Sequence, residues 1–250
     1  MKIAVCFLSI IKDHFNLQNL KNQANNSKYH QIDIYEYLDY DSEYKNENNT
    51  IYFNYPELKR KFNYLYEYDW KPGLGKKEGM MFLPFLDMWL KHKNEYDFYL
   101  FIEDDVSYFG NKNLFDTINF DCHALMIFHP YMFTKYMQNH WWLVQAPHYL
   151  DPNIIKDNCH RYCNIFGMQS NIVSQLVDFI DEGNYAFFEW MIPSFLFNIP
   201  IKINYISSYL RVFDTFDETH LPKQLFYEMI HPIKNIETYN YYKNNFIPIN

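Results

Sequence analysis

An acidic triplet, Glu103, Asp104 and Asp105, follows directly on the uninterrupted apolar run at 98–102. A run of that kind is typical of a strand that is buried on both faces of a sheet. Carboxylates this close together repel one another, so a half-buried position for them requires a compensating cation. Oxygen ligands suit Mg²⁺ or Mn²⁺, which bind one or two protein carboxylates together with substrate phosphates. The triplet therefore predicts a divalent-metal site at the end of this strand, with a solvated acidic turn as the alternative.

The elements that would position this triplet alternate between strand and helix along the chain. Strands are expected at 2–10, 31–38, 51–54, 97–102, 125–128, 165–167 and 199–206. Helices are expected at 13–25, 56–68, 76–93, 171–180 and 187–197, with a polar loop at 41–50 and a tail after the last strand. This alternation favours an α/β fold with a mainly parallel central sheet flanked by helices. Open α/β sheets bind ligands at the carboxyl ends of their strands, which is where the triplet is expected.

The composition argues against several classes of partner and fold. A formal net charge of −8 repels a polyphosphate backbone, so no nucleic-acid partner is expected. The 250 residues include 6 glycines, and neither G-x-G-x-x-G nor G-x-x-x-x-G-K-[ST] occurs among them. The lack of a glycine-rich phosphate loop weighs against nucleotidyl or phosphoryl transfer. Because no linker or internal repeat interrupts the chain, we expect one domain.

The first residues lead straight into a strand pattern, and the apolar stretch at 190–201 is too short to span a bilayer. We therefore expect a cytoplasmic protein with reduced thiols and no transmembrane segment, for which peripheral association with a membrane stays open. The pair Cys159 and Cys163, with Cys122 and His123 upstream, lacks the usual spacing of a structural zinc site. Buried thiols are the better interpretation of these cysteines.

The aromatic strand ending in Glu103-Asp104-Asp105 resembles the DxD segment of nucleotide-sugar glycosyltransferases of the GT-A fold. The resemblance implies a GT-A-like, Rossmann-like sheet in a single domain at 1–250, with a nucleotide-binding half at 1–110, an acceptor and catalytic half at 111–235 and a tail at 236–250. It also implies that Asp105 binds a divalent metal, Mn²⁺ or Mg²⁺. Glu103 is expected in the same metal site, where it would contact the ribose or the water shell of the metal.

Three further segments resemble this family in the same order. Gly167, after a strand, stands where the family has a glycine-bearing acceptor loop. The helix start Phe187-Phe188-Glu189-Trp190 resembles the segment that carries an acidic catalytic base, which would make Glu189 the base. Asp181 and Glu182 are the other candidates, although 181–184 is typical of a turn. The segment Ile230-His231-Pro232-Ile233-Lys234 resembles the one with a C-terminal histidine that completes the metal site.

The expected activity is metal-dependent transfer of a sugar from a nucleotide-sugar donor, with a UDP-sugar as the expected donor, to a hydroxyl of a glycan or glycoconjugate. A base such as Glu189, on a different segment from the metal, predicts inversion at the anomeric carbon. The expected nucleotide-binding residues are Glu103, Asp104, Ser9, Lys77 and Lys234. The expected substrate-binding residues are Gly167, Trp141 and Trp190. A nucleotidyl or phosphoryl transferase, and a sugar-binding domain without catalysis, are the alternatives.

Overall fold

The computed structural model describes residues 1–9, 12, 14–39, 45–47, 50–53, 58, 82–127, 163–182, 184, 188–214 and 218–248. For residues 39, 45–47, 188–190 and 218 it describes the backbone alone. Most of the helix expected at 56–68 and the first part of the helix expected at 76–93 lie outside the described residues.

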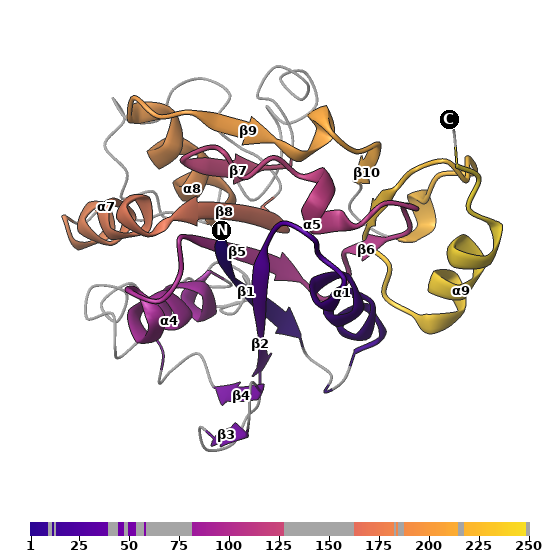
Figure 1. Cartoon of the computed structure of the whole chain (residues 1–250), viewed down its shortest axis with the longest axis horizontal. Helices are drawn as coiled ribbons and strands as arrows, with labels where there is room; N and C mark the ends of the chain where they lie inside the picture. The colour runs from indigo at the N-terminus through magenta and orange to yellow at the C-terminus, as the bar shows by residue number, and fades with distance from the viewer. Residues whose placement is uncertain are drawn as a thin grey trace.

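Eight strands in the described part of the chain form one sheet, in the order β3-β4-β2-β1-β5-β8-β7-β9. The strands are β1 (Lys2–Ser9), β2 (Gln31–Asp39), β3 (Lys45–Glu47), β4 (Thr50–Phe53), β5 (Phe98–Glu103), β7 (Ala124–Met126), β8 (Ile165–Gln169) and β9 (Ile203–Tyr205). Neighbouring strands are parallel except for the pairs β3–β4, β5–β8 and β7–β8. In Figure 1 the sheet extends from β9 at the top to β3 at the bottom. The predicted α/β fold with a mainly parallel sheet is confirmed, whereas the expectation of a loop throughout 41–50 is wrong because β3 lies within it.

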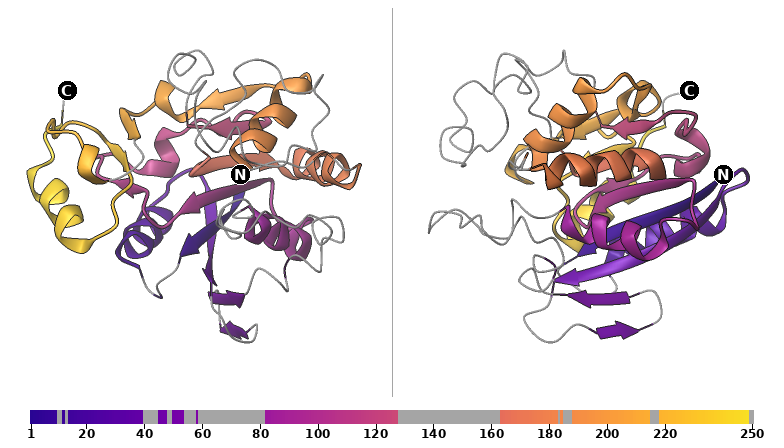
Figure 2. Two further views of the ribbon diagram at one scale, coloured as in Figure 1. Left: turned by 180° about the vertical axis from the view of Figure 1, so that it is seen from behind. Right: turned by 90° about the vertical axis from the view of Figure 1, so that its left-hand side faces the viewer.

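Helices cover both faces of this sheet because both faces of its central strands are apolar. In β1, Ala4, Cys6 and Leu8 face one way, toward α4 (Leu83–His92), α7 (Ser170–Asp181) and α8 (Phe188–Asn198). The alternate residues of the same strand face α1 (Phe15–Asn25) and α5 (Leu114–Thr117). Figure 2 shows α4 and α7 on one side of the sheet and α1 on the other, seen from behind. The strand pattern thus produces three layers, with the sheet between two layers of helix.

The predicted helices agree with the structure in place but not always in length. α4 begins at Leu83 rather than at residue 76, and Pro84 stands in its first turn. Proline is tolerated there because the first amide groups of a helix have no partner within the helix. α1 begins after His14, whose side chain accepts a hydrogen bond from the Asn16 amide. The described cysteines Cys6, Cys122 and Cys163 are buried free thiols.

The last part of the chain is folded. The expectation of a tail after the strand at 199–206, and of a tail domain at 236–250, is therefore wrong. Three short strands, β10 (Val212–Asp214), β11 (Met229–His231) and β6 (Ser107–Tyr108), form a second sheet. α9 (Ile236–Asn245) buries Tyr239 and Tyr242 against Ile230 and Ile233. In Figure 1 this yellow segment lies beside β6 and α1, beyond the end of β5. Among the described residues, no helix combines the length and the apolar character needed to cross a bilayer.

Candidate metal centre

The acidic triplet lies where the strand order of the sheet reverses. The chain places β2 and then β4 on one side of β1, and then places β5 on its other side, with all four strands parallel. The crevice outside the carboxyl ends of strands at such a reversal is where open α/β sheets bind ligands. Glu103 is the last residue of β5, and Asp104 and Asp105 follow in a turn. β1 ends beside them at Ser9, whose Oγ donates a hydrogen bond of 2.8 Å to Asp104 Oδ2.

The second sheet brings His231 to the same turn. β11 pairs antiparallel with β6, which starts two residues after Asp105, and Ile230 is the partner of Ser107 in this pairing. The backbone amide of Ile233 donates a 2.7 Å hydrogen bond to the carbonyl oxygen of Asp105. Two segments that are far apart in the sequence are therefore fixed against each other by backbone contacts on both sides of His231.

The side chains of Glu103, Asp105 and His231 converge. Each offers one ligand atom, and these atoms all lie within 4.8 Å of one another. His231 Nε2 is 3.2 Å from Asp105 Oδ1 and 4.0 Å from Glu103 Oε2. The exposed fractions of the three side chains, 12% for Glu103, 17% for Asp105 and 11% for His231, leave them partly open to solvent. The structure thus brings together the three residues that were predicted as metal ligands, and their role as ligands stays a prediction.

The charges of this cluster depend on one another. Burial alone would lower the pKa of His231, but the negative charge of Asp105 and the hydrogen bond to Asp214 raise it well above its ordinary value. Burial alone would raise the pKa of Asp105, but the charges of His231 and Lys234 lower it. Two carboxylates in a half-buried position are therefore compensated by the imidazolium when no other cation is present.

The donor set fits a divalent cation. Asp105 Oδ1 is buried and has no hydrogen bond of standard geometry among the described residues, although His231 Nε2 lies near it. A cation would satisfy this oxygen. Two carboxylates and one imidazole form a mixed set of oxygen and nitrogen ligands, which suits Mn²⁺. The two carboxylates by themselves would also suit Mg²⁺, which prefers oxygen ligands. Three protein ligands leave coordination positions for the phosphate oxygens of a substrate.

Two buried polar residues beside His231 were missed by the sequence analysis. Asp214 is the partner of His231 in the parallel pairing of β10 with β11, and its Oδ1 is 2.7 Å from His231 Nδ1. Asn164 precedes β8; its backbone carbonyl accepts the amide of Glu103, and its side-chain nitrogen is 3.1 and 2.9 Å from the two ring nitrogens of His231. Nothing local marks either residue, because each reaches the site through pairing of strands that are distant in sequence.

Helix α1 fixes the backbone that carries the triplet. Asn16, Asn19 and Gln23 lie on one face of the helix because they are three and seven residues apart. Asn16 Nδ2 donates to the carbonyl of Asp104 at 2.7 Å, and Asn19 Nδ2 donates to the carbonyl of Tyr108 at 2.8 Å. Gln23 Oε1 accepts the amide of Leu114 at 2.9 Å. The side-chain amides of one helix therefore hold the segment from the acidic turn to the start of α5.

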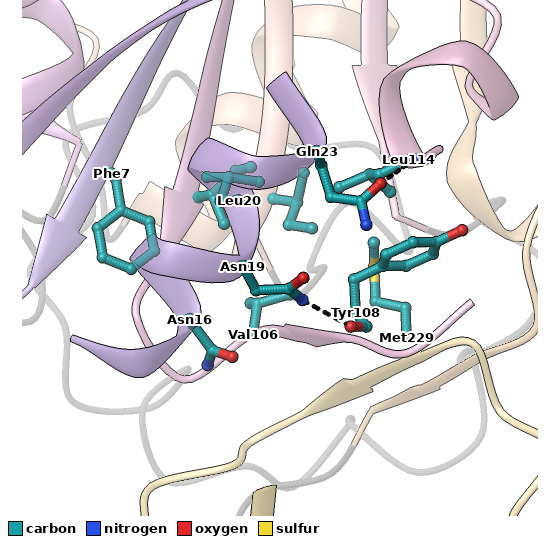
Figure 3. A pocket seen from close by; sticks show the side chains of 11 residues that line it. Phe7, Asn16, Asn19, Leu20, Gln23, Val106, Tyr108, Leu114 and Met229 are labelled. Atoms are coloured by element: carbon teal, nitrogen blue, oxygen red, sulfur yellow. Dashed lines mark hydrogen bonds between the residues drawn. The ribbon is translucent and has the colours of Figure 1, made fainter. Parts of the chain in front are cut away.

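A small cavity lies behind these contacts, between α1 and the second sheet. Figure 3 shows Asn19 and Gln23 pointing into it from α1, opposite Tyr108 and Met229. Its volume of about 20 Å³ is enough for one water molecule and far too small for a substrate. The cavity is thus part of the packing that supports the acidic turn and is distinct from the candidate centre.

The structure describes some of the remaining predicted site residues and leaves others undescribed. Lys234 is exposed, and its charge contributes to the lowered pKa of Asp105, so it is near the cluster. Glu189 and Trp190 lie in the first turn of α8, as expected of a helix start, but their side chains are not described. Lys77 and Trp141 lie outside the described residues. Of the other candidate bases, Asp181 is the last residue of α7 and Glu182 follows it.

Gly167 does not lie in a loop after a strand, so that expectation is wrong. It is a buried residue in the middle of β8, where it pairs with Leu100 of β5 and Leu125 of β7. A Cβ atom at this position would lie 2.5 Å from Phe98 Cε1 and 2.9 Å from the carbonyl oxygen of Tyr99. The glycine is therefore required by the close packing of β8 on β5.

The chain was also compared with known proteins. No protein-family model matches it, and a search of curated proteins finds no significant match.

Proposed function

We propose that this protein is a metal-dependent glycosyltransferase of the GT-A type, which moves a sugar from a nucleotide-sugar donor to a hydroxyl of a glycan or glycoconjugate. A UDP-sugar is the proposed donor, Mn²⁺ or Mg²⁺ the proposed cofactor and the cytoplasm the proposed location. The observation that carries the proposal is the convergence of Glu103, Asp105 and His231 at the carboxyl ends of β1 and β5.

The position of the centre supports a nucleotide as the ligand. Parallel sheets with this strand order bind nucleotides in the crevice where the order reverses. The exposed Lys234 lies near Asp105, so its ammonium group can pair with a phosphate of the donor. Asp104 Oδ2 accepts a hydrogen bond from Ser9 Oγ, and both residues lie at the same edge of the sheet, at the carboxyl ends of β1 and β5. The Lys234 ammonium group can therefore orient the diphosphate with its leaving oxygen toward the cation that Asp105 and His231 would hold.

A bound divalent cation would supply Lewis acidity to the diphosphate leaving group. Glu103, Asp105 and His231 would hold it, and Lys234 would balance the remaining negative charge of the phosphates. Glu189 would accept the proton of the attacking hydroxyl of the acceptor, because a hydroxyl is a poor nucleophile until a base within hydrogen-bond reach removes its proton. A base on α8, on a separate segment from the metal ligands, favours direct displacement with inversion at the anomeric carbon.

A screen of donor hydrolysis tests the proposal. The purified chain is incubated with a panel of nucleotide sugars and Mn²⁺, and release of the nucleoside diphosphate is measured with and without EDTA. Hydrolysis of one donor that requires Mn²⁺ supports the proposal. Cleavage of ATP or another nucleoside triphosphate in preference to every nucleotide sugar would favour a nucleotidyl or phosphoryl transferase. Binding of sugars with no hydrolysis of any donor would favour a non-catalytic sugar-binding domain.

A matched pair of variants makes this screen specific to the centre. Asp105→Asn keeps the shape of a half-buried ligand and removes its charge. Asp121→Asn makes the same change at a carboxylate that is 94% exposed and pairs with Lys202. Loss of hydrolysis in the first variant and retention in the second is the expected result. Equal activity of the two variants would contradict the proposed site.

A further inference from the structure

The imidazole of His231 is held on one side by Asp214, a carboxylate that is not one of the three candidate metal ligands. Asp214 and His231 are partners in the parallel pairing of β10 with β11. The side chain of Asp214 is 0% exposed, and its Oδ1 is 2.7 Å from His231 Nδ1. We propose that Asp214 is a positioning residue that keeps the proton of His231 on Nδ1 and thereby presents Nε2 to a divalent cation, an inference that rests on the proposed metal-dependent function.

The hydrogen bond between Asp214 and His231 decides which ring nitrogen carries the proton. A neutral imidazole carries its proton on one nitrogen and an unshared electron pair on the other. An ionised carboxylate has no proton to donate and acts only as a hydrogen-bond acceptor. The hydrogen bond to Asp214 therefore requires the proton to be on Nδ1. A buried carboxylate without such a donor is costly, which makes the opposite tautomer unfavourable at this position. Asp214 therefore selects the tautomer in which Nε2 is the free ligand.

The other ring nitrogen of His231, Nε2, faces the two candidate carboxylate ligands. This nitrogen lies 3.2 Å from Asp105 Oδ1 and 4.0 Å from Glu103 Oε2, so it faces the two carboxylates that form the rest of the donor set. Asn164 Nδ2 is almost equally far from both ring nitrogens, which places the amide against the ring rather than on the electron pair of one nitrogen. The ring is thus held between Asp214 and Asn164 with Nε2 toward the centre.

The hydrogen bond to Asp214 also affects how strongly His231 can bind a metal ion. A hydrogen bond from Nδ1–H to a carboxylate raises the basicity of the other ring nitrogen and fixes the orientation of the ring. Loss of such a partner typically weakens metal binding by about 10–100-fold. Asp214 does not need to touch the cation or the substrate to have this effect. Its contribution is measurable as metal affinity, without any assay of transfer.

The experiment compares Mn²⁺ binding by the full chain and by two variants, using calorimetric titration with Mn²⁺ alone. Asp214→Asn replaces the carboxylate by an amide that can also donate to Nδ1, and we expect an affinity about 10–100-fold weaker than that of the unmodified chain. Asp87→Asn is the matched control. Asp87 lies on α4, and its side chain is almost as deeply buried as that of Asp214. It accepts a hydrogen bond from Tyr37, and α4 packs on the face of the sheet away from β10 and β11. We expect its substitution to leave Mn²⁺ affinity unchanged.

A second measurement needs no variant and so does not depend on the folding of Asp214→Asn. The ¹⁵N chemical shifts of the His231 ring, recorded on the unmodified chain saturated with Zn²⁺, a diamagnetic ion that binds imidazole nitrogen, report which ring nitrogen carries the proton. We expect the proton on Nδ1. A proton on Nε2 would overturn the inference, because that tautomer cannot ligate through Nε2.

The outcomes separate this inference from the proposed function. Equal Mn²⁺ affinity of Asp214→Asn and the unmodified chain would overturn the role of Asp214 and leave the function standing. A chain that binds Mn²⁺ through His231 but hydrolyses no nucleotide sugar would overturn the function and leave the role of Asp214 standing. A chain that binds no Mn²⁺ would overturn both.

Discussion

The side-chain amide of Asn16 donates a hydrogen bond of 2.7 Å to the backbone carbonyl of Asp104, so the first turn of α1 holds the acidic turn directly. The oxygen of the same amide accepts a 2.8 Å hydrogen bond from Ser107 Oγ. Both Asn16 and Ser107 are buried, and no aliphatic side chain could satisfy the two groups at once. The geometry of the candidate centre therefore depends on a residue that would not itself touch metal or substrate.

Asn16→Leu tests this dependence. The variant removes the Asn16 partner of the part-buried Asp104 carbonyl and of the buried Ser107 hydroxyl. A buried polar group that loses its partner costs about 1–3 kcal/mol. We expect the free energy of unfolding, measured in urea, to fall by a few kcal/mol and Mn²⁺ affinity to fall with it. Asn22→Leu on the same helix is the control, because Asn22 is exposed and accepts hydrogen bonds from Asn26, the C-cap residue of α1. Equal stability of the two variants would show that the contact of Asn16 is unimportant.

Gly167→Ala should destabilise the fold. The new methyl group would overlap a ring carbon of Phe98 and a backbone oxygen of Tyr99, and the oxygen cannot move without disturbing the pairing of β5 with β8. Overpacking of this kind costs about 1–3 kcal/mol. Thermal unfolding is the measurement, and an unchanged midpoint would contradict the packing argument. An acceptor-loop role would instead predict normal stability with altered acceptor KM.

Asp105→Ala should abolish metal-dependent nucleotide binding and sugar transfer, because it removes a charged oxygen ligand that lies 3.2 Å from His231 Nε2. EDTA should have the same effect on the unmodified chain. Binding of UDP in the presence of Mn²⁺, followed by fluorescence or calorimetry, measures the first effect. The metal mechanism does not survive if Asp105→Ala transfers sugar at the normal rate or if excess EDTA leaves the rate unchanged.

The stability of the metal-free protein should depend on pH through His231 and Asp105. The pKa of His231 is raised in the folded state, so its contribution is fully present below its ordinary value of 6.5 and is lost as pH rises through the raised value. The pKa of Asp105 is lowered, so its contribution is present above its ordinary value of 3.8 and is lost as pH falls through the lowered value. The two contributions are therefore both fully present between pH 3.8 and pH 6.5.

His231→Gln provides the matching measurement. In urea unfolding of the EDTA-treated protein across this pH range and above it, the variant should lose the decline in stability that the unmodified chain shows on the alkaline side. Addition of Mn²⁺ at pH 8 should stabilise the unmodified chain and not the variant, since a ligand that binds only the folded state adds stability by mass action. Parallel pH profiles for the two chains would contradict the assigned pKa shift.

Glu189→Gln should reduce turnover by about 10²–10⁴-fold while leaving donor binding intact, because it removes a positioned base and keeps its shape. The residual rate should no longer fall as pH drops toward the pKa of a carboxyl group. Glu182→Gln, at the end of α7, is the control among the other candidate bases. Near-normal turnover of Glu189→Gln, or an NMR spectrum of a product with retained anomeric configuration, would refute the assignment.

The sequence predicts the parts of the centre that carry a local signal. Glu103 and Asp105 follow a strand whose apolar character is visible in the residues themselves, and the structure places them at the end of β5. His231 has no such signal, and only its resemblance to a family segment pointed to it. Asp214 ends a three-residue strand, and its position beside His231 is set by a strand pairing that no local pattern encodes.

α9 was missed because its sequence, rich in tyrosine and asparagine, lacks the usual apolar stripe. Its buried face consists of Tyr239 and Tyr242, whose rings pack in one cluster with Ile230 and Ile233, and the Tyr242 hydroxyl donates a hydrogen bond to the carbonyl of Pro222. One signal was available: Asn235 stands directly before the helix and its side chain accepts the Thr238 amide at 2.8 Å. An asparagine followed by Glu237 in the first turn is a typical start of a helix.

The pairing of β6 with β11 also sets the order in which a ribosome can complete the centre. His231 follows Asp105 by 126 residues (231 − 105). At a synthesis rate of about 5–20 residues per second, the carboxylates leave the ribosome roughly 6–25 s before the imidazole that faces them. During that interval β6 has no β11 to pair with, and the acidic turn has neither the backbone contact from Ile233 nor the charge of His231. A nascent chain can therefore assemble β1, β2 and β5 well before it can hold a cation in the proposed manner.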